Sequence, residues 1–254
     1  MIIDANTWIG HWAFRALPQR SAKDLLKQMD GLNIDKALVG NLNGLLYKDV
    51  HESNHELTRE LKRHRDRLVP CALINPTYDG WRDDLRQCRE EFGMPVIRLT
   101  PDYHGYALAD PCTLELISAA HELKMRVAFY WRIVDSRGRH RLDPGREANE
   151  TAVRDVLKQF PKAHFLMLNF PRVLDKPRPK ADCLYDLTLF MGRNGLRLMD
   201  EIAEHGAKTF AVGTTMLLRY GSAPLLALEK CKLAKRDREA IQWRNIVNLA
   251  PDLK

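Results

Sequence analysis

The chain has 254 residues, of which 45% are hydrophobic and 29% charged, and its formal net charge is +7 at pH 7. This length is ample for one large core, and the composition is that of a globular enzyme, which excludes a disordered or fibrous protein. No stretch approaches the roughly 18 apolar residues of a membrane span, and no basic segment followed by an apolar run opens the chain, so we predict a cytoplasmic protein without a membrane partner.

Short apolar runs rich in Val, Ile, Leu and Phe alternate with amphipathic stretches along the whole chain, as repeated βα units do. Eight runs are predicted strands: IID (2–4), KALVGN (36–41), LVPCALIN (68–75), PVIRLT (95–100), RVAFYW (126–131), HFLMLNF (164–170), CLYDLTLF (183–190) and TFAVGTT (209–215). Eight strands over this length predict an α/β protein, a (β/α)8 TIM barrel formed by a single domain over 1–254.

Helices are predicted between these strands because apolar residues recur there at i, i+3 or i+4 with charges between them. The predicted helices are 21–32, 49–64, 79–92, 110–124, 146–160, 195–206, 223–233 and 236–249. Ser21 and Asp24 predict a capping box at the first of them.

A TIM barrel carries its active site at the carboxyl ends of its strands. The residues at the predicted strand ends are Asn6, Trp8, Asn41, Asn43, Asn75, Arg98, Thr100, Asp102, Tyr130, Arg132, Asn169, Asp186, Thr188, Thr214 and Thr215. They form a set rich in neutral hydrogen-bonding groups and arginine, and poor in metal ligands.

Seven segments follow one another in an order that a known family shares: IIDANTW, MDGLNIDKALVG, DRLVPCALINP, IRLTPDYHGYALADP, FPKAHFLMLN, FAVGTTM and RNIVNLA. Over nearly the whole chain they resemble the amidohydrolase-related family, the TIM-barrel group that includes aminocarboxymuconate semialdehyde decarboxylase. The resemblance implies a metal-dependent hydrolase or decarboxylase fold.

The resemblance also implies a divalent metal held by His-x-His on strand 1, by His after strands 5 and 6, and by Asp after strand 8. Those positions hold Asn6, Trp8, Tyr130, Asn169 and Thr215 in this chain. Zinc needs imidazole, thiolate or carboxylate ligands, which none of these five side chains supplies. We therefore predict a branch of the family with no metal and no cofactor.

Two loops on the predicted active face contain groups that transfer protons or bind anions. PDYHGY (101–106) holds His104, and DSRGRHR (135–141) holds Asp135 and Arg137, where an arginine fork suits a carboxylate or phosphate. The alternative for the first loop is tyrosine packing with a surface histidine, and for the second a solvated loop. Arg98, within a strand, needs a buried partner, for which Asp186 is one candidate.

We hypothesise that the protein is a hydrolase or lyase that acts without metal on a small polar, anionic molecule, with His104 and Asp135 as catalytic residues. The predicted ligand-binding residues are Asn6, Trp8, Asn75, Arg98, Tyr103, Tyr130, Arg132, Arg137, Asn169 and Thr215. One alternative is a non-catalytic ligand-binding protein. Another is a metal enzyme with improvised ligands, namely His11, His104, His140 and Asp135. The sequence leaves open whether the chain forms a homo-oligomer.

Other motifs have simpler explanations. His51 and His55 match H-E-x-x-H, but no clear third ligand follows, so we interpret the motif as an exposed helix face. The basic clusters are interleaved with acidic or apolar residues, which favours solvated surfaces over a nucleic-acid partner. Five widely spaced cysteines without a CxxC pair predict reduced thiols.

Overall fold

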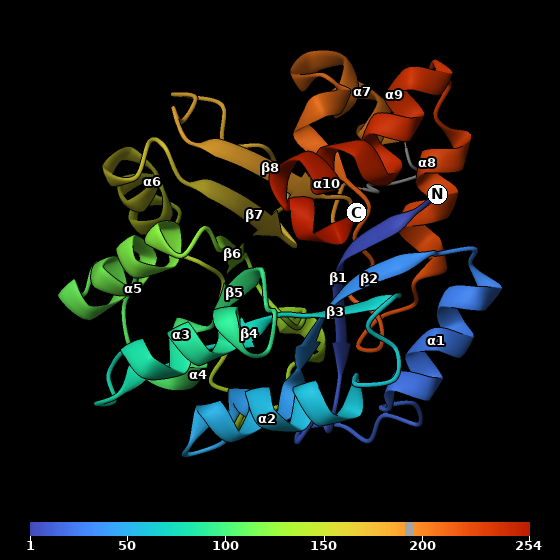
Figure 1. The fold of residues 1–254 in the computed structure, drawn as a ribbon. Helices are drawn as coiled ribbons and strands as arrows, with labels where there is room; N and C mark the ends of the chain where they lie inside the picture. Colours follow the sequence, from blue (N-terminus) through green and yellow to red (C-terminus); the bar gives the residue numbers. More distant parts are fainter. Residues whose placement is uncertain (191–195) are drawn as a thin grey trace.

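The computed structural model describes residues 1–190 and 196–254, and its strands lie at the centre with the helices around them (Figure 1). The strands are β1 (Ile3–Ile9), β2 (Lys36–Asn41), β3 (Leu68–Pro70), β4 (Ala72–Leu73), β5 (Val96–Leu99), β6 (Arg126–Tyr130), β7 (His164–Leu168), β8 (Asp182–Asp186) and β9 (Phe210–Ala211). Each lies within or overlaps a predicted strand. The seventh predicted strand is shorter than expected, because β8 ends at Asp186.

All strand pairs are parallel, in two sheets of order β1-β2-β3 and β4-β5-β6-β7-β8-β9. β3 and β4 together occupy the third barrel position, where the Cys71 amide donates to the carbonyl of Val39 at 2.8 Å. The Ala5 amide donates to the Val212 carbonyl at 2.9 Å, and the Thr215 amide donates to the Asn6 carbonyl at 2.7 Å. These bonds join the first and last strands, so the predicted (β/α)8 barrel is confirmed.

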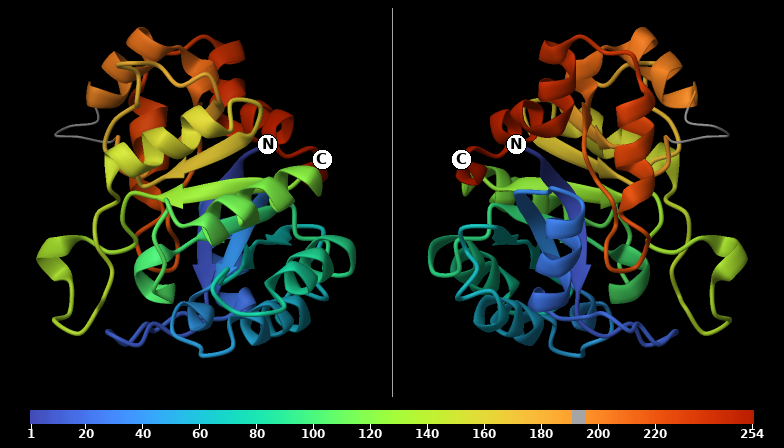
Figure 2. Two further views of the ribbon diagram at one scale, coloured as in Figure 1. Left: turned by 90° about the vertical axis from the view of Figure 1, so that its left-hand side faces the viewer. Right: turned by 90° about the vertical axis from the view of Figure 1, so that its right-hand side faces the viewer.

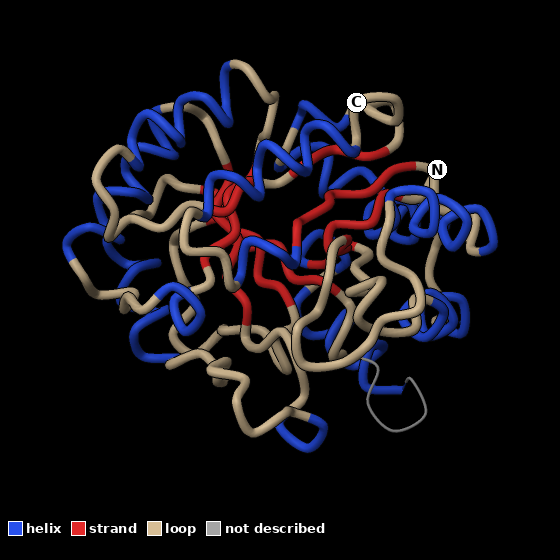
Figure 3. The backbone as a smooth tube through the Cα atoms, turned by 90° about the horizontal axis from the view of Figure 1, so that it is seen from below, coloured by secondary structure: helices blue, strands red, loops and turns tan. Residues whose placement is uncertain are grey.

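The helices form the outer layer, which is also visible in the tube view (Figure 3). They are α1 (Ala22–Gly31), α2 (Val50–Glu60), α3 (Trp81–Glu90), α4 (Pro101–His104), α5 (Pro111–Glu122), α6 (Glu150–Gln159), α7 (Leu196–His205), α8 (Ser222–Lys230), α9 (Lys235–Glu239) and α10 (Asn245–Leu249). The last predicted helix is divided into α9, a π-helical segment η5 (Ala240–Arg244) and α10. Gly195, the predicted start of α7, lies outside the described residues.

Local sequence explains several helix ends. The side chain of Ser21 accepts from the Asp24 amide and that of Asp24 accepts from the Ser21 amide, which confirms the capping box of α1. The segment PDYHGY was expected to be a loop, but its first four residues form α4, because Pro101 suits a first helical turn and Gly105, at φ +70°, ends it.

Hydrophobic side chains pack in two groups, one between the sheet and the helices and one inside the barrel. The inner group includes Ile3, Ala5 and Trp8 of β1. The β1–β2 register shifts between Asp4 and Thr7, where β1 has one more residue than β2. Such a bulge changes the direction of the side chains that follow it, and here both Asn6 and Trp8 reach the barrel interior.

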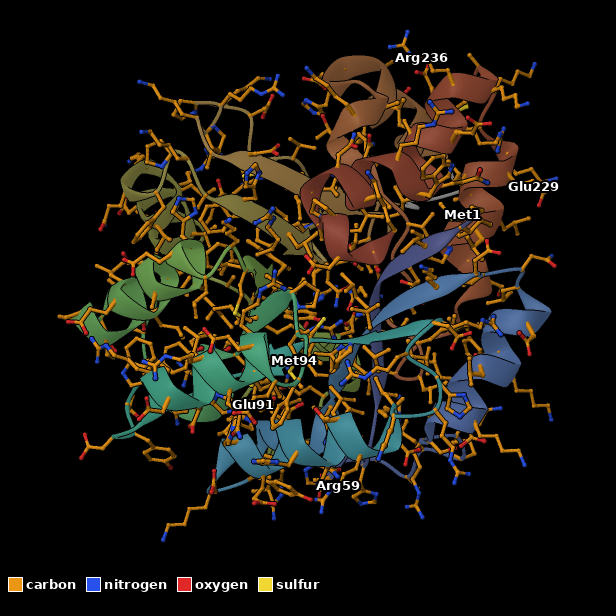
Figure 4. All side chains as sticks on the ribbon, viewed as in Figure 1. Met1, Arg59, Glu91, Met94, Glu229 and Arg236 are labelled. Carbon is orange, nitrogen blue, oxygen red and sulfur yellow. The ribbon has the colours of Figure 1, made fainter. Side chains whose placement is uncertain are left out.

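Charged side chains lie mainly outside this layer, as Figure 4 shows for Arg59, Glu229 and Arg236 at the periphery. Two long segments continue beyond the strand ends: 10–20 after β1, and 131–149 after β6, which contains η2 (Ser136–Gly138). The second projects from the body of the molecule (Figure 2, lime). No helix among the described residues is long and apolar enough to cross a membrane.

Candidate functional site

The side chain of Asn6 is the hub of a buried hydrogen-bond network in the barrel interior. Its amide nitrogen lies 2.7 Å from Oδ2 of Asp186, 3.1 Å from Oδ1 of Asn169 and 3.1 Å from Oγ1 of Thr215. Its amide oxygen accepts from the hydroxyl of Tyr130 at 2.9 Å. The structure therefore brings together four of the predicted ligand-binding residues, from the ends of four different strands.

Backbone geometry holds two members of this network in place. Asn169 and Thr215 have φ values of +56° and +58°, a conformation that is unfavourable for a β-branched residue such as threonine. The Thr215 hydroxyl donates to Oδ1 of Asn169 at 2.8 Å, and Asn169 in turn donates its Nδ2 to the carbonyl of Arg132 at 2.8 Å. These bonds hold both side chains toward the barrel centre.

Two buried carboxyl groups lie next to the network. Asp186 accepts from the Asn169 amide at 2.9 Å and from the Thr188 hydroxyl at 2.8 Å, and burial raises its pKa above the usual value. Asp4 accepts from the hydroxyl of Thr214 at 2.5 Å, and burial raises its pKa to about 7. Neither was among the predicted site residues, although Asp186 was recognised as a strand end.

Arg98 and Trp8 pack against each other in the barrel interior. The guanidinium of Arg98 donates to the carbonyls of Thr7 and Leu38, at 2.8 and 3.0 Å, and lies 4.6 Å from the centre of the Trp8 ring. Both side chains are at most 1% exposed and neither lines a described cavity. Among the described residues no carboxylate lies within ion-pair distance of Arg98. The expected pairing with Asp186 does not form, and Arg98 binds backbone carbonyls instead.

The barrel centre offers a poor set of ligands for a divalent metal. The five positions named by the resemblance supply amide, hydroxyl and indole groups. The side-chain nitrogen of Asn6 already lies within hydrogen-bond distance of three oxygens, one of them from the Asp186 carboxylate. The buried Nε1 of Trp8 has no partner among the described residues, and an N–H group repels a cation. Zinc, manganese or iron therefore does not fit these side chains.

A different cluster of potential metal ligands lies near the end of α7. Within residues 1–190 and 196–254, three acidic or histidine side chains come within ligand distance of one another at Asp175, Glu204 and His205. The ammonium group of Lys176 lies 3.8 Å from both carboxylates. A cation from the chain itself is thus already present there, and the cluster is formed outside the barrel centre.

The two residues predicted to be catalytic each have protein partners. His104 donates its Nε2 proton to the Gly44 carbonyl at 2.9 Å, and its Nδ1 lies 3.2 Å from the Thr100 hydroxyl. Burial lowers its pKa, so it is a neutral imidazole with both nitrogens engaged. Asp135 pairs with Arg132 at 2.9 Å and with Arg137 at 3.0 Å, and the hydrogen bonds from Arg137 hold its pKa well below the usual value.

Two further predicted ligand-binding residues have local roles. Asn75 accepts from the Thr77 amide at 3.1 Å and donates to the carbonyl of His104 at 3.2 Å, so it caps the turn after β4. The side chain of Arg137 is 90% exposed and its described contacts are with Asp135. Neither lines a described cavity.

A pocket of about 440 Å³ lies at the carboxyl ends of β5 and β6. Three predicted ligand-binding residues line it, Tyr103, Tyr130 and Arg132, together with Tyr106, Arg146 and the carboxylates of Asp102 and Glu147. Arg132 is oriented by Asp135 and by Glu147, whereas Arg146 is exposed and forms no ion pair among the described residues. We call this the Tyr–Arg pocket. Arg146 was missed because it was taken as the first residue of a predicted helix, which in the structure begins only at Glu150, and no local pattern marks it.

The H-E-x-x-H motif lies on α2 and is less exposed than predicted. The rings of His51 and His55 lie 4.7 Å apart and both pack on Phe92, with ring distances of 5.9 and 4.9 Å. His51 also contacts the side-chain oxygen of Gln87 at 2.7 Å. This half-buried aromatic contact between α2 and α3 gives the histidines a packing role.

Comparison with known proteins identifies solved structures that share this fold. No protein-family model and no curated protein matches the chain. Among solved structures, 2,6-dihydroxybenzoate decarboxylase from Rhizobium is 13% identical with a TM-score of 0.73, covering 98% of each chain. 5-Carboxyvanillate decarboxylase from Sphingomonas paucimobilis is 8% identical with a TM-score of 0.73, again covering 98% of each chain.

A third similar structure is 4-oxalomesaconate hydratase from Rhodopseudomonas palustris, which is 16% identical with a TM-score of 0.71 and covers 100% of this chain and 96% of its own. These solved structures are TIM-barrel decarboxylases and a hydratase of the amidohydrolase type. The chain therefore has the fold that the sequence resemblance implied, over its whole described length.

Proposed function

We propose that the protein is an amidohydrolase-related barrel that binds a small anionic organic molecule in the Tyr–Arg pocket, without a divalent metal at the barrel centre. The observation that carries this proposal is the pairing of tyrosines with two arginines at the carboxyl ends of β5 and β6. Barrel proteins bind their ligands at this end, and apolar walls with a few charged groups are typical of small-molecule sites.

The arginines favour an anion for separate reasons. Arg132 is held in place by two carboxylates, so its orientation is set before a ligand arrives. Arg146 has no such partner among the described residues and supplies a positive charge that a ligand carboxylate can pair with. The rings of Tyr103, Tyr106 and Tyr130 supply flat apolar walls. A planar acid fits this combination.

Hydrolysis or C–C bond cleavage is the second candidate function, and it is favoured by the names of the similar solved structures, two decarboxylases and a hydratase. Proton transfer by His104 and Asp135 stays a prediction, but their contacts give both groups structural partners. Asp186 is the better candidate, because burial raises its pKa and its Oδ2 lies 2.7 Å from the side-chain nitrogen of Asn6.

The test combines binding and turnover. Aromatic and aliphatic carboxylates and lactones are titrated calorimetrically, and product formation is followed for wild type and for His104→Ala, Asp135→Ala and Arg146→Met. We expect Arg146→Met to weaken carboxylate binding by about ten-fold or more, because a charge-assisted hydrogen bond is lost. Arg141→Met, on the same exposed segment but outside the pocket, is the matched control.

Saturable binding without turnover supports a non-catalytic ligand-binding protein, and turnover supports the hydrolase or lyase. If carboxylates bind wild type and Arg146→Met equally well, the Tyr–Arg pocket is not the binding site.

The absence of a catalytic metal is tested separately by elemental analysis of protein purified without chelator. We expect zinc, manganese and iron to be far below one equivalent, because the barrel centre supplies neutral groups and two carboxyl groups that are already hydrogen-bonded. A near-stoichiometric metal that is lost from Asn6→Ala or Asp186→Asn would contradict this part of the proposal. Metal that both variants retain would indicate the Asp175, Glu204 and His205 cluster instead.

A further inference from the structure

A second cavity, of about 610 Å³, lies on another side of the barrel mouth. Its walls come from the segment 15–19 after β1, the segment 217–220 after β9, and the first turn of α8. Thr188 and Thr214, which follow β8 and β9, form part of its lining. We call it the β9–α8 cavity. None of the predicted catalytic or ligand-binding residues lines this cavity.

Two arginines in this cavity have no acidic partner. Arg15 and Arg219 both line it, and among the described residues neither lies within ion-pair distance of a carboxylate. The Nη2 atom of Arg219 is buried and has no hydrogen-bond partner in the described part of the chain. Burial and the positive charge of Arg132 lower the pKa of Arg219, and the carboxylates of Asp135 and Asp186 offset part of this effect from beyond ion-pair distance. Arg219 is half-buried, and a half-buried cation without a directly paired carboxylate favours an anion in the cavity.

The two nearby carboxylates, Asp186 and Asp135, already have other hydrogen-bond or ion-pair partners. Asp186 accepts hydrogen bonds from Asn6, Thr188 and the Asn169 amide. Asp135 is paired with two other arginines, Arg132 and Arg137. Arg15 is exposed and donates to the Leu218 carbonyl at 3.0 Å, so the cavity is lined by two arginines that are not directly paired with a carboxylate among the described residues.

The first turn of α8 adds a further positive end. This helix has nine residues, begins after Gly221 and has no side-chain cap at its N-terminus. Ala223 and Pro224 of its first turn line the cavity, and because proline has no N–H group, Ala223 supplies the amide of this pair. The amides at a helix N-terminus and the helix dipole attract anions. In TIM barrels, the loops after the seventh and eighth strands and the N-terminus of a helix frequently form a phosphate site. Here β8 and β9 are those strands.

We propose that the β9–α8 cavity binds the phosphate group of a phosphate monoester through Arg15, Arg219 and the N-terminus of α8. A phosphate monoester carries about −1.5 to −2 charges at pH 7, which matches two unpaired arginines better than one carboxylate does. Arginine forks bind phosphate oxygens in pairs. The volume exceeds that of a phosphate group alone, so part of the organic body of the ligand is held in the same cavity.

Inorganic phosphate is the probe, titrated against the full chain at constant ionic strength and pH 7.5 by calorimetry and by phosphorus NMR. We expect saturable binding that falls by roughly ten- to a hundred-fold in Arg219→Met and by a smaller factor in Arg15→Met. Arg141→Met, an exposed arginine that lines neither the Tyr–Arg pocket nor the β9–α8 cavity, is the matched control and should bind phosphate as wild type does. Binding should also weaken as the pH falls through about 7, where inorganic phosphate takes up a proton and loses one negative charge.

If Arg219→Met does not fold, Arg219→Lys and Arg15→Met replace it, and the lysine variant should bind with intermediate affinity because it keeps the charge and loses the fork. Three results would overturn the proposal: no saturable phosphate binding by wild type, equal binding by wild type and the Arg15 and Arg219 variants, or tighter binding of malonate than of phosphate. The last would make the cavity a carboxylate site.

Discussion

Arg98 illustrates how one buried cation organises its surroundings. Its guanidinium spans the carbonyls of Thr7 and Leu38 and lies on the ring of Trp8, so three strands contribute to its position. Gly40 makes this arrangement sterically feasible, because a Cβ there would lie 2.5 Å from Arg98 and 2.7 Å from the Trp8 ring. The glycine is therefore required by a close approach of side chains, and its own backbone conformation is ordinary.

We predict that Gly40→Ala lowers the free energy of unfolding by about 1–3 kcal/mol, because an added methyl group in a packed core displaces its neighbours. Gly138→Ala is the control, since nothing lies within 4 Å of a Cβ at that position, and its effect should stay within about 0.5 kcal/mol. Urea denaturation measures both. Equal stability of the two variants would mean that Arg98 and Trp8 can move away from the new methyl group.

The buried carboxyl group of Asp4 predicts a pH dependence of stability. Burial raises its pKa in the folded protein from 3.8 to about 7. A raised pKa means that the folded state holds a proton that the unfolded state has lost, so its contribution is complete below about pH 4 and is lost as the pH rises to about 7.

Relative to Asp4→Asn, the wild type should therefore lose stability between pH 4 and pH 7, by an amount on the order of 4 kcal/mol, and change little above pH 7. Urea denaturation of both proteins at intervals across this range measures the difference. A difference that does not vary with pH would show that Asp4 is ionised in the folded protein throughout.

At the level of elements, the start of α1 tests how much a local motif contributes. We predict that Ser21→Ala costs about 1 kcal/mol, because the side chain that caps the Asp24 amide is lost. Ser118→Ala is a suitable control, since its hydroxyl makes a 3.4 Å contact with Glu122 in the interior of α5 and caps nothing. Thermal or urea unfolding should separate the two variants, and an unchanged Ser21→Ala protein would assign the helix start to tertiary packing alone.

The predicted helix bounds were most accurate for α1, α3 and α5, where each predicted end lies within two residues of the observed one. They were less accurate where tertiary context overrides local pattern. The PDYHGY segment forms a helical turn, and the final helix contains the π-helical segment η5, whose extra residue per turn leaves no signature in composition. On α2, the packing of His51 on Phe92 depends on the next βα unit.

For the whole molecule, closure of the barrel between β1 and the segment after β9 determines whether the site exists. The closing hydrogen bonds are donated by the amides of Ala5 and Thr215, and both residues are at most 1% exposed. We predict that these two amides exchange with solvent only by near-global unfolding, whereas the amide of Leu142, which bonds to His140 on an exposed segment, exchanges by local opening.

Hydrogen exchange followed by NMR or mass spectrometry measures this difference. Equally fast exchange at Ala5 and Leu142 would mean that the barrel opens between its first and last strands without unfolding. In that case the network around Asn6, which spans the same boundary, would open as well.

The sequence by itself determined the fold, because the alternation of apolar strands and amphipathic helices is a local property that repeats eight times. It also indicated that Tyr130, Asn169 and Thr215 lie at or after strand ends, which converge in a parallel barrel. Asn6, expected just after the first strand, lies inside β1. The direction in which these side chains point, and the groups that they bind, were decided only by the tertiary structure. The bulge in β1 turns Trp8 inward onto Arg98, and the carbonyl of the distant Gly44 accepts from Nε2 of His104. The partners of Asp135, Arg132 and Arg137, lie close to it in sequence.

Arg146 and Arg219 are two pocket residues that the sequence did not identify. Each is one of 40 basic residues in the chain, and nothing beside it in the sequence distinguishes it. What distinguishes them is the lack of an acidic partner next to a cavity, and that depends on which segments the folded barrel brings together. Hydrophobic periodicity can be recognised within a short segment of the chain. The charge balance of a cavity depends on residues that are distant from one another in sequence.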